Sequence, residues 1–546
     1  MLRGVFLIFL FLMLAPFSMQ AQTYYWVGFT DKSGSPYSIN NPSEYLSERA
    51  ILRRQKQGIS IDETDLPVKR EYINQVLGLG ATYIHSSKWL NGVTVQCDSA
   101  DFAEQVSAFS FVREVQVTKR NLTSTKSLKN KFHEPGYGKV ETAIDTSYYG
   151  PSVYQVGMLN GQYLHEQNYL GQEMQIAVLD AGFYRANELQ AFDSLWINGQ
   201  ILGTHDFVNP DSDIFQEHYH GMTVLSTMGG NMPGVLIGTA PKASFWLIRS
   251  EDALSEFIIE EDNWAAAAEF ADSVGVDVIN SSLGYSTFDD AETNHTYTDM
   301  DGQTTRVSRA ADIAASRGIL VVTSAGNEGN DPWRYILAPA DGDSVLAVAA
   351  VDRDRAPAFF TSHGPASDGD VKPNVAALGL YTVLASSSGT LTYGSGTSYS
   401  SPLMAGMAAC LWQANPEASA SQVKNAIEKS ADLYNSPDTL LGYGIPDFEI
   451  ADRILKFSLA ASKESKWWIY PNPAQNSFSI FQKGELIPGE LNITLFDITG
   501  RVLGSKVLPS AMTNVVEGIA NWPAGVLFLR IDSEEGAETL KLVKSH

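Results

Sequence analysis

Short apolar runs alternate with helical segments between residues 150 and 455, and this alternation limits the possible folds more than any other feature of the sequence. Helical patterns at Trp264–Ser273 and Ser308–Arg317 lie among runs that have the length of buried strands. These runs are Gln175–Leu179, Ser244–Ile248, Val276–Asn280 and Gly318–Thr323. Buried strands that alternate with helices predict an α/β domain, a parallel sheet with helices on both faces. Functional side chains are then expected at the carboxyl ends of the strands.

Smaller blocks flank this domain, which we place at 148–455. Residues 22–120 mix strand and helix patterns, which predicts a small α+β unit, and residues 121–147 are polar and indicate an exposed linker. After a second linker at 456–467, residues 468–546 hold short strands between Gly and Pro turns, which predicts a small β-sandwich.

Residues 1–21 have the basic start, apolar run and small final residue of a secretory signal peptide. Beyond them, no run approaches the ~18 apolar residues that a transmembrane helix needs, so no transmembrane segment is expected. The sequence therefore predicts an exported protein.

Charge and cysteine content narrow the partners and the chemistry. The 546 residues include 38 basic and 62 acidic side chains, a formal charge of −24, and such a surface repels phosphate groups. We therefore expect no nucleic acid partner. The only cysteines are Cys97 and Cys410, which cannot form a disulfide framework. Two separate buried thiols are the favoured interpretation, and a bridge between them is the alternative.

Polar residues suited to acyl transfer stand at the ends of predicted elements. Asp180 follows the first of the four strands, although a lone Asp there is more typical of a cap or turn. His220 begins an apolar helix, and with His218 it could instead bind a metal, but no third ligand is evident. Ser398 precedes a buried apolar helix, where a nucleophile and an N-cap are equally good interpretations. Asn327 follows the fourth strand in a Gly-rich turn, also a routine place for Asn.

Taken together, these four residues favour catalysis over the separate interpretations. Acyl transfer needs a hydroxyl, an imidazole base, a carboxylate that orients the base, and a donor for the oxyanion. The candidates for these roles, in the same order, are Ser398, His220, Asp180 and Asn327. The chain order Asp, His, Ser differs from that of α/β-hydrolases, and no Gly-x-Ser-x-Gly motif surrounds Ser398.

Three motifs resemble those of the subtilisin-like serine peptidases, the subtilase family, over about residues 150–455. The first is Ile176–Gly182 around the Asp, with Ala181 where Ser or Thr is usual. The second is His220–Thr223, in which Met222 and Thr223 differ from the family motif. The third is Gly396–Ser398 followed by Pro402, with Ser400, Ser401 and Leu403 in place of the usual Ala, Thr and His. The resemblance implies a subtilisin-like parallel sheet and a secreted serine endopeptidase (EC 3.4.21) that hydrolyses proteins or peptides through an acyl-enzyme.

The resemblance also assigns Ser282, Leu283 and Gly284 to a backbone edge that pairs with an extended substrate. The departures from the motifs leave all four candidate catalytic residues in place. A catalytically silent binding or adhesion protein on the same fold is the alternative.

The flanking blocks resemble known accessories of such peptidases. Residues 22–120 are similar to subtilase propeptides, which assist folding and block the cleft, so the chain would be a zymogen that cleaves itself within 121–147. Motifs at Tyr470–Ala474, Leu495–Arg501 and Ala524–Phe528 resemble the type A sorting domain of the type IX secretion system of Bacteroidetes. This implies export by that machinery to the cell surface or exterior; an adhesive or carbohydrate-binding sandwich is the alternative.

No cofactor is required by the implied chemistry. Calcium is frequent in the family, and Asp299–Gly302 offers oxygen ligands, but this loop lacks the spacing of an EF-hand and a plain turn is the favoured interpretation. The identity of any metal ligand therefore stays open at the level of sequence.

Overall fold

The computed structural model of the chain describes residues 22–120, 130–132, 148–463, 466–482, 486–497 and 499–545. The predicted signal peptide at 1–21 and most of the predicted linker at 121–147 lie outside these ranges. The chain divides into two compact units, residues 1–455 and 456–546, which are described separately. Within the described ranges, no helix combines the length and apolarity needed to cross a membrane.

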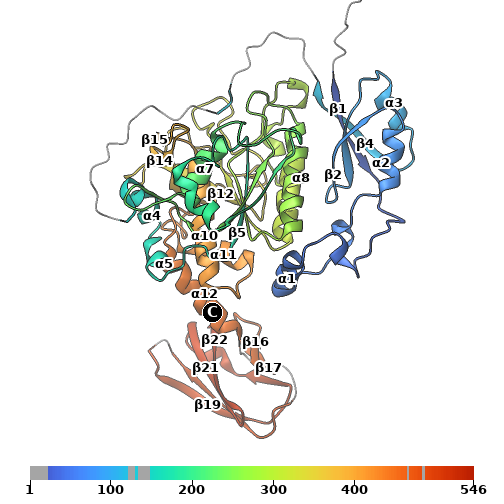
Figure 1. Cartoon of the computed structure of the whole chain (residues 1–546). Helices are drawn as coiled ribbons and strands as arrows, with labels where there is room; N and C mark the ends of the chain where they lie inside the picture. The colour runs from blue at the N-terminus through green and yellow to red at the C-terminus, as the bar shows by residue number, and fades with distance from the viewer. Residues whose placement is uncertain are drawn as a thin grey trace, which may run out of the picture. The chain divides into compact units, whose positions relative to one another are not determined.

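A seven-stranded parallel sheet forms the centre of the first unit (Figure 1). Its strands are β5 (Gln175–Asp180), β6 (Ile201–Asp206), β9 (Ser244–Arg249), β10 (Val278–Ser281), β11 (Leu320–Ser324), β12 (Leu346–Val351) and β13 (Val375–Leu378). They lie in the order β13-β12-β11-β10-β5-β9-β6. The predicted parallel sheet is confirmed, and β5, β9, β10 and β11 correspond to the four runs identified from the sequence.

Helices cover both faces of this sheet (Figure 1). On one face, α8 (Ile259–Val274) and α9 (Arg306–Ser316) bury small residues against the strands. On the other, α7 (His220–Gly229) packs on β5, and α10 (Thr397–Ala414) packs on the strands from β10 to β13. Smaller elements complete this central lobe: α4 (Val153–Gly157), α5 (Gln162–Glu166), α6 (Asp193–Ile197), β7 (Asn231–Met232), β8 (Leu236–Ile237), β14 (Thr382–Ala385), β15 (Leu391–Gly394) and α11 (Ala420–Ser430). The helix α12 (Phe448–Lys463) crosses the boundary at residue 455, so residues 456–463 of the predicted second linker are helical.

Residues 22–120 form an amino-terminal lobe built on an antiparallel sheet in the order β2-β3-β1-β4. The elements are β1 (Thr23–Phe29), α1 (Glu48–Gln57), α2 (Arg70–Leu77), β2 (Thr82–Ser87), β3 (Gly92–Gln96), α3 (Phe102–Ser107) and β4 (Val112–Arg120). Side chains alternate along β1, so that Tyr25 and Val27 pack with α2 and α3, while Trp26 enters the core shared with α8 and α9. The predicted α+β unit is confirmed, and its sheet lies beside α8 of the central lobe (Figure 1).

Buried charges also join the two lobes. Asp272 of α8 pairs with Arg53 at 2.6 Å, Arg54 at 3.0 Å and Lys88 at 3.0 Å, and its carboxylate is fully buried. Nearby, His85 of β2 shares a hydrogen bond of 2.8 Å with Asn263 of α8. The face of α8 that meets the amino-terminal lobe is therefore polar and acidic as well as apolar.

The second unit is rich in strands, as the sequence predicts. Two antiparallel sheets, in the orders β16-β17-β20 and β19-β18-β21-β22, share one hydrophobic core that includes Trp467, Phe478, Leu495 and Leu529. The strands are β16 (Trp467–Tyr470), β17 (Ser477–Gln482), β18 (Leu491–Phe496), β19 (Val502–Leu508), β20 (Thr513–Glu517), β21 (Gly525–Ser533) and β22 (Gly536–Lys544). This unit therefore has a core of its own.

Both cysteines are buried free thiols. The separate-thiol interpretation is confirmed, since Cys97 lies in the core of the amino-terminal lobe and Cys410 lies in α10. Stability therefore comes from packing and not from crosslinks.

Candidate active site

Asp180 and His220 form a buried pair between the last residue of β5 and the first residue of α7. His220 Nδ1 lies 2.8 Å from Asp180 Oδ1, which also accepts a 2.7 Å hydrogen bond from the Ala181 N–H. A carboxylate can only accept, so Nδ1 carries a proton, and Nε2 is the nitrogen that can act as a base. A Cβ at position 221 would lie 2.5 Å from the Gly182 carbonyl oxygen, so glycine allows α7 to start this close to Asp180.

Ser398 is the second residue of α10, whereas the sequence predicted it just before a helix. Pro402 has no N–H to donate to the Ser398 carbonyl one turn earlier, and the helix tolerates this because Ser282 Oγ donates to that carbonyl at 2.9 Å. In return, Ser398 Oγ donates to the Ser282 carbonyl at 3.2 Å. The hydroxyl is therefore turned toward the chain that follows β10.

Asn327 is held by the residue before Ser398. Its Oδ1 accepts hydrogen bonds from the Thr397 N–H at 2.8 Å and from the Thr397 hydroxyl at 3.0 Å. Because the oxygen is fixed in this way, the Nδ2 amine is the part of the amide that can donate to another group. Asn327 and Ser398 both line a cavity of about 350 Å³, and Ser282, Leu283 and Gly284 form part of its wall. The structure thus brings the predicted oxyanion donor, nucleophile and substrate edge to one cleft.

A short segment of the predicted linker lies in this cleft. The Phe132 ring stacks on the His220 ring with centroids 4.1 Å apart, and the Lys131 N–H donates to the Ala253 carbonyl at 3.2 Å. Phe132 and Lys131 also line the cavity that contains Ser398. The expectation of an exposed linker is therefore wrong for these residues, because an aromatic ring and a long cation find partners in the cleft.

Lys131 meets three acidic residues that the sequence did not identify. Its ammonium group pairs with Glu251, with Glu256 at 2.7 Å and with Glu260 at 2.9 Å. Glu251 follows β9, while Glu256 and Glu260 lie before and within the first turn of α8. In sequence, such acidic residues are typical of a solvated helix start, and nothing connects them with a lysine more than a hundred residues earlier.

The side chains of both candidate metal sites have hydrogen-bond partners within the chain. Both ring nitrogens of His218 are engaged, Nε2 with Asn130 at 3.0 Å and Nδ1 with the His220 N–H at 3.3 Å. Burial, together with His220 and nearby cations, lowers the pKa of His218 to about 3, so this ring is neutral. In the candidate calcium loop, Asp299 accepts from the Thr296 N–H and Asp301 accepts from two N–H groups that follow it.

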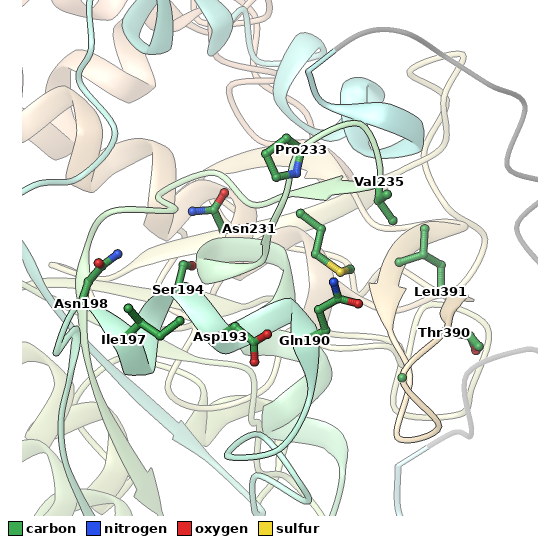
Figure 2. Close-up of a pocket in the computed structure, with 12 residues that line it drawn as sticks. Gln190, Asp193, Ser194, Ile197, Asn198, Asn231, Pro233, Val235, Thr390 and Leu391 are labelled. Carbon is green, nitrogen blue, oxygen red and sulfur yellow. The ribbon is translucent and has the colours of Figure 1, made fainter.

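A larger cavity, of about 820 Å³, lies between α6, the β7–β8 turn and the β14–β15 turn (Figure 2). Its described lining is mostly polar or aliphatic, with Gln190, Asp193 and Asn231 beside Ile197 and Leu391 (Figure 2). None of the candidate catalytic residues belongs to that lining. Size alone therefore does not locate the chemistry in this molecule.

Three stretches of the chain match known protein families. Residues 24–134 match the peptidase S8 propeptide domain of Bacteroidota, residues 171–444 match the subtilase family, and residues 468–545 match the secretion system C-terminal sorting domain. The sorting domain indicates export through the type IX secretion system to the cell surface or exterior.

Individual proteins are similar to the central part of the chain. Subtilisin DY of Bacillus licheniformis is 30% identical over 285 residues, which cover 51% of this chain and 90% of that protein. Subtilisin E of Bacillus subtilis (strain 168) is 30% identical over 315 residues, covering 56% of this chain and 73% of that protein. A crystal structure of MycP1 from the ESX-1 type VII secretion system is 20% identical, with a TM-score of 0.42, and the match covers 56% of this chain and 89% of that chain.

The family matches agree with the fold. The subtilase match spans about half of the chain and includes both β5 and α10, which carry the Asp and Ser of the candidate site. An S8 propeptide domain precedes it and a sorting domain follows it. The chain belongs to the subtilase family of serine peptidases.

Proposed function

We propose that this protein is a secreted serine endopeptidase in which Asp180, His220 and Ser398 form the catalytic triad. The observation that carries the proposal is the 2.8 Å bond between Asp180 and His220 beside a cleft lined by Ser398 and Asn327. Side chains and backbone groups of this chain suffice for the reaction, so we propose that no cofactor is required.

In the first step, His220 Nε2 removes the proton from Ser398 Oγ, and the oxygen attacks the carbonyl carbon of a peptide bond. Asp180 keeps the imidazole oriented and stabilises its positive charge. The leaving amine takes the proton from Nε2, and a water molecule then hydrolyses the acyl-enzyme with His220 again as the base. Ser398 Oγ must first rotate away from the Ser282 carbonyl, to which it donates at 3.2 Å.

The negative oxygen that forms during attack needs donors. We assign this role to Asn327 Nδ2 and the Ser398 N–H, since Thr397 already fixes the other end of the Asn327 amide. The backbone of Ser282, Leu283 and Gly284 would bind an extended substrate through main-chain hydrogen bonds, and these residues line the same cavity.

Cleavage of internal bonds is favoured by what the cleft contains. Lys131 and Phe132 belong to the interior of a polypeptide, and the cleft accommodates them without a free chain end. An enzyme that needs a terminus would recognise a free amine or carboxylate instead.

Because Phe132 covers His220, we also propose that residues 22–120 and the following segment inhibit the enzyme until cleavage within 121–147 releases a peptidase of about 148–455.

A fluorophosphonate probe tests the triad and excludes or supports the silent alternative. Full-length protein that has been allowed to process itself should be labelled at Ser398, and the Ser398→Ala variant should not be labelled. Absence of labelling, in the presence of a labelled active peptidase, would mean that the fold serves binding or adhesion and not hydrolysis.

Peptides with blocked ends test the endopeptidase assignment. Unlabelled enzyme from a preparation whose separate aliquot is labelled at Ser398 should cleave a peptide acetylated at its amino end and amidated at its carboxyl end as well as it cleaves the same peptide with free ends. Cleavage confined to free ends would leave the serine peptidase intact and make it an exopeptidase.

A further inference from the structure

Three glutamates form an acidic cluster at one end of the cleft, which we call the glutamate cluster: Glu251, Glu256 and Glu260. One oxygen from each lies within 4.8 Å of the others. The side chains of Glu251 and Glu260 are 3% and 2% exposed, and that of Glu256 is 23% exposed. Three carboxylates this close and this buried repel one another, so they require a cation to remain ionised together.

The Lys131 ammonium group supplies that cation in this structure. It pairs with all three carboxylates, and its side chain is only 19% exposed. Burial lowers the pKa of Lys131, but the three carboxylates outweigh it and raise this pKa well above the usual value. Burial and the neighbouring carboxylates raise the pKa of Glu256 to about 7 even beside this lysine. The cluster therefore needs its positive charge.

The cluster is held in place by groups other than Lys131. The Tyr285 hydroxyl donates to Glu251 at 2.7 Å, and the Asp252 N–H donates to Glu260 at 3.0 Å. Tyr285 is fully buried, and Glu260 lies in the first turn of α8. Glu251 and Glu260 therefore keep these hydrogen bonds when Lys131 leaves, so the glutamate cluster is preformed. Glu256 lies at the more exposed side of the cluster.

The position of the cluster relates it to the reaction. Lys131, Glu251 and Glu256 line the same cavity as Asn327 and Ser398. The residue after Lys131 is Phe132, whose ring covers His220, and the Lys131 N–H pairs with the Ala253 carbonyl at the rim. The side chain in the cluster therefore belongs to the residue immediately before the one that covers the catalytic imidazole.

We infer that the glutamate cluster is a specificity subsite that binds a lysine or arginine side chain of the substrate, at a fixed position on the amino-terminal side of the cleaved bond. The inference rests on the proposed function. When the propeptide segment departs, a cationic substrate residue takes the place of Lys131. A neutral residue leaves buried carboxylates unpaired, and an acidic residue adds a fourth negative charge.

Cleavage-site profiling with a mixed peptide library tests the subsite. The full chain is allowed to process itself, active enzyme is counted by fluorophosphonate titration, and the library is digested and its cleavage sites are read by mass spectrometry. We expect lysine and arginine to be enriched at one position before the cleaved bond. For the best peptide, replacing that residue with alanine should lower kcat/KM at least ~10-fold, as for other desolvated charge pairs.

Variants of Glu256 connect the preference to the cluster. Glu256→Gln should reduce the enrichment of basic residues, and Glu256→Lys should abolish it, because the introduced ammonium group would pair with Glu251 and Glu260. The matched control is Glu292→Gln, which removes the same charge from a side chain that is 81% exposed. That variant should keep the profile of the parent.

Two results would overturn the inference. A profile without basic preference, from enzyme of which a separate aliquot is labelled at Ser398, would remove the subsite and leave the peptidase proposal standing. A calcium-dependent rise in Tm that Glu256→Gln abolishes, again without basic preference, would make the cluster a metal site instead. If neither labelling nor cleavage occurs, the proposed function itself fails, and the inference falls with it.

Discussion

Two serines from different elements hold each other in this cleft. Ser282 Oγ donates to the Ser398 carbonyl, and Ser398 Oγ donates to the Ser282 carbonyl. The first bond satisfies a carbonyl that Pro402 leaves without its helical donor. It therefore fixes the start of α10 and with it the backbone of the proposed nucleophile.

Removing the Ser282 hydroxyl should affect turnover more than substrate binding. Ser282→Ala leaves the Ser398 carbonyl without this donor, and the lost hydrogen bond is worth about 1 kcal/mol, or roughly fivefold in rate. We expect kcat to fall by about that factor while KM changes little. The control is Ser400→Ala, because the Ser400 hydroxyl donates to the Thr397 carbonyl within its own helix turn. A rise in KM with unchanged kcat would contradict the positioning role.

Asn327 is the residue whose replacement should separate transition-state stabilisation from folding. Asn327→Ala removes the Nδ2 donor, and kcat should fall by roughly 10² to 10³. Asn327→Asp keeps an acceptor for Thr397 but cannot donate, so it should lose comparable activity while its Tm stays closer to that of the parent. Recovery of activity in the Asp variant would show that Asn327 acts only by holding Thr397.

The sequence identified those side chains that stand at the ends of recognisable elements. Asp180 ends a strand, His220 starts a helix, and both were located because their elements have clear apolar patterns. The glutamate cluster could not be predicted because its partner Lys131 comes from a polar stretch without periodicity. Contacts between distant and irregular segments leave no pattern in a single sequence.

At the scale of elements, α8 packs against other parts of the protein on two of its faces. One face packs in the core of the parallel sheet, and the other receives the amino-terminal lobe through His85, Lys88 and two arginines. His85 is neutral there because burial lowers its pKa to about 4. Its Nδ1 is buried and finds no acceptor among the described residues, so a second proton would be unpaired.

Acid should therefore weaken this contact through His85. Its folded pKa of about 4 lies below the ordinary 6.5, so the unfolded chain binds more protons between these values. Its contribution to stability is complete above pH 6.5 and is lost as the pH falls toward 4, by ~1.4 kcal/mol per pH unit.

The measurement uses the full chain carrying Ser398→Ala, which cannot process itself, with and without His85→Gln. Between pH 7 and pH 5, the unfolding free energy of the parent should fall by about 2 kcal/mol more than that of the His85→Gln variant. Other buried groups titrate in both proteins, such as Asp262, whose pKa burial raises to about 6, so they cancel in the comparison. Parallel curves for the two proteins would refute the assignment to His85.

Element prediction from sequence succeeded where the apolar runs were long and bounded by turns. The strands β6, β12 and β13 were not identified. The β6 segment Ile201–Asp206 is half polar, and Leu346–Val351 and Val375–Leu378 are short runs of Ala, Val and Leu that fit a buried helix equally well. The start of α10 was placed too late for a related reason. Pro402 looks like the first turn of a helix, and only the donor from Ser282 shows why the helix begins earlier.

At the scale of the whole molecule, the peptidase and the sorting domain have separate cores. The second unit buries Phe478, Leu495 and Leu529 among its own strands, and among the described residues no strand of its sheets comes from the first unit. Each unit is therefore expected to fold without the other.

A chain that ends at Ser465 tests this independence. It should be labelled by fluorophosphonate as efficiently per molecule as the full chain, because the cleft lies wholly within the first unit. It should accumulate inside cells, whereas the full chain should reach the surface or the medium. The full chain with Ser398→Ala is the matched control, since antibodies should find it outside cells although it cannot be labelled. Loss of labelling in the shortened chain would mean that the second unit is needed for the active fold.

Because the second unit has a separate core, mutations in the two units of this protein should have different effects. Substitutions in that core affect secretion, so the amount of enzyme that reaches the medium changes while the kcat of each secreted molecule stays the same. Substitutions around Lys131 and the glutamate cluster alter the moment of activation and the choice of target, while delivery is unchanged. Mutations in different parts of the gene could therefore change the secretion of this enzyme and its substrate preference independently.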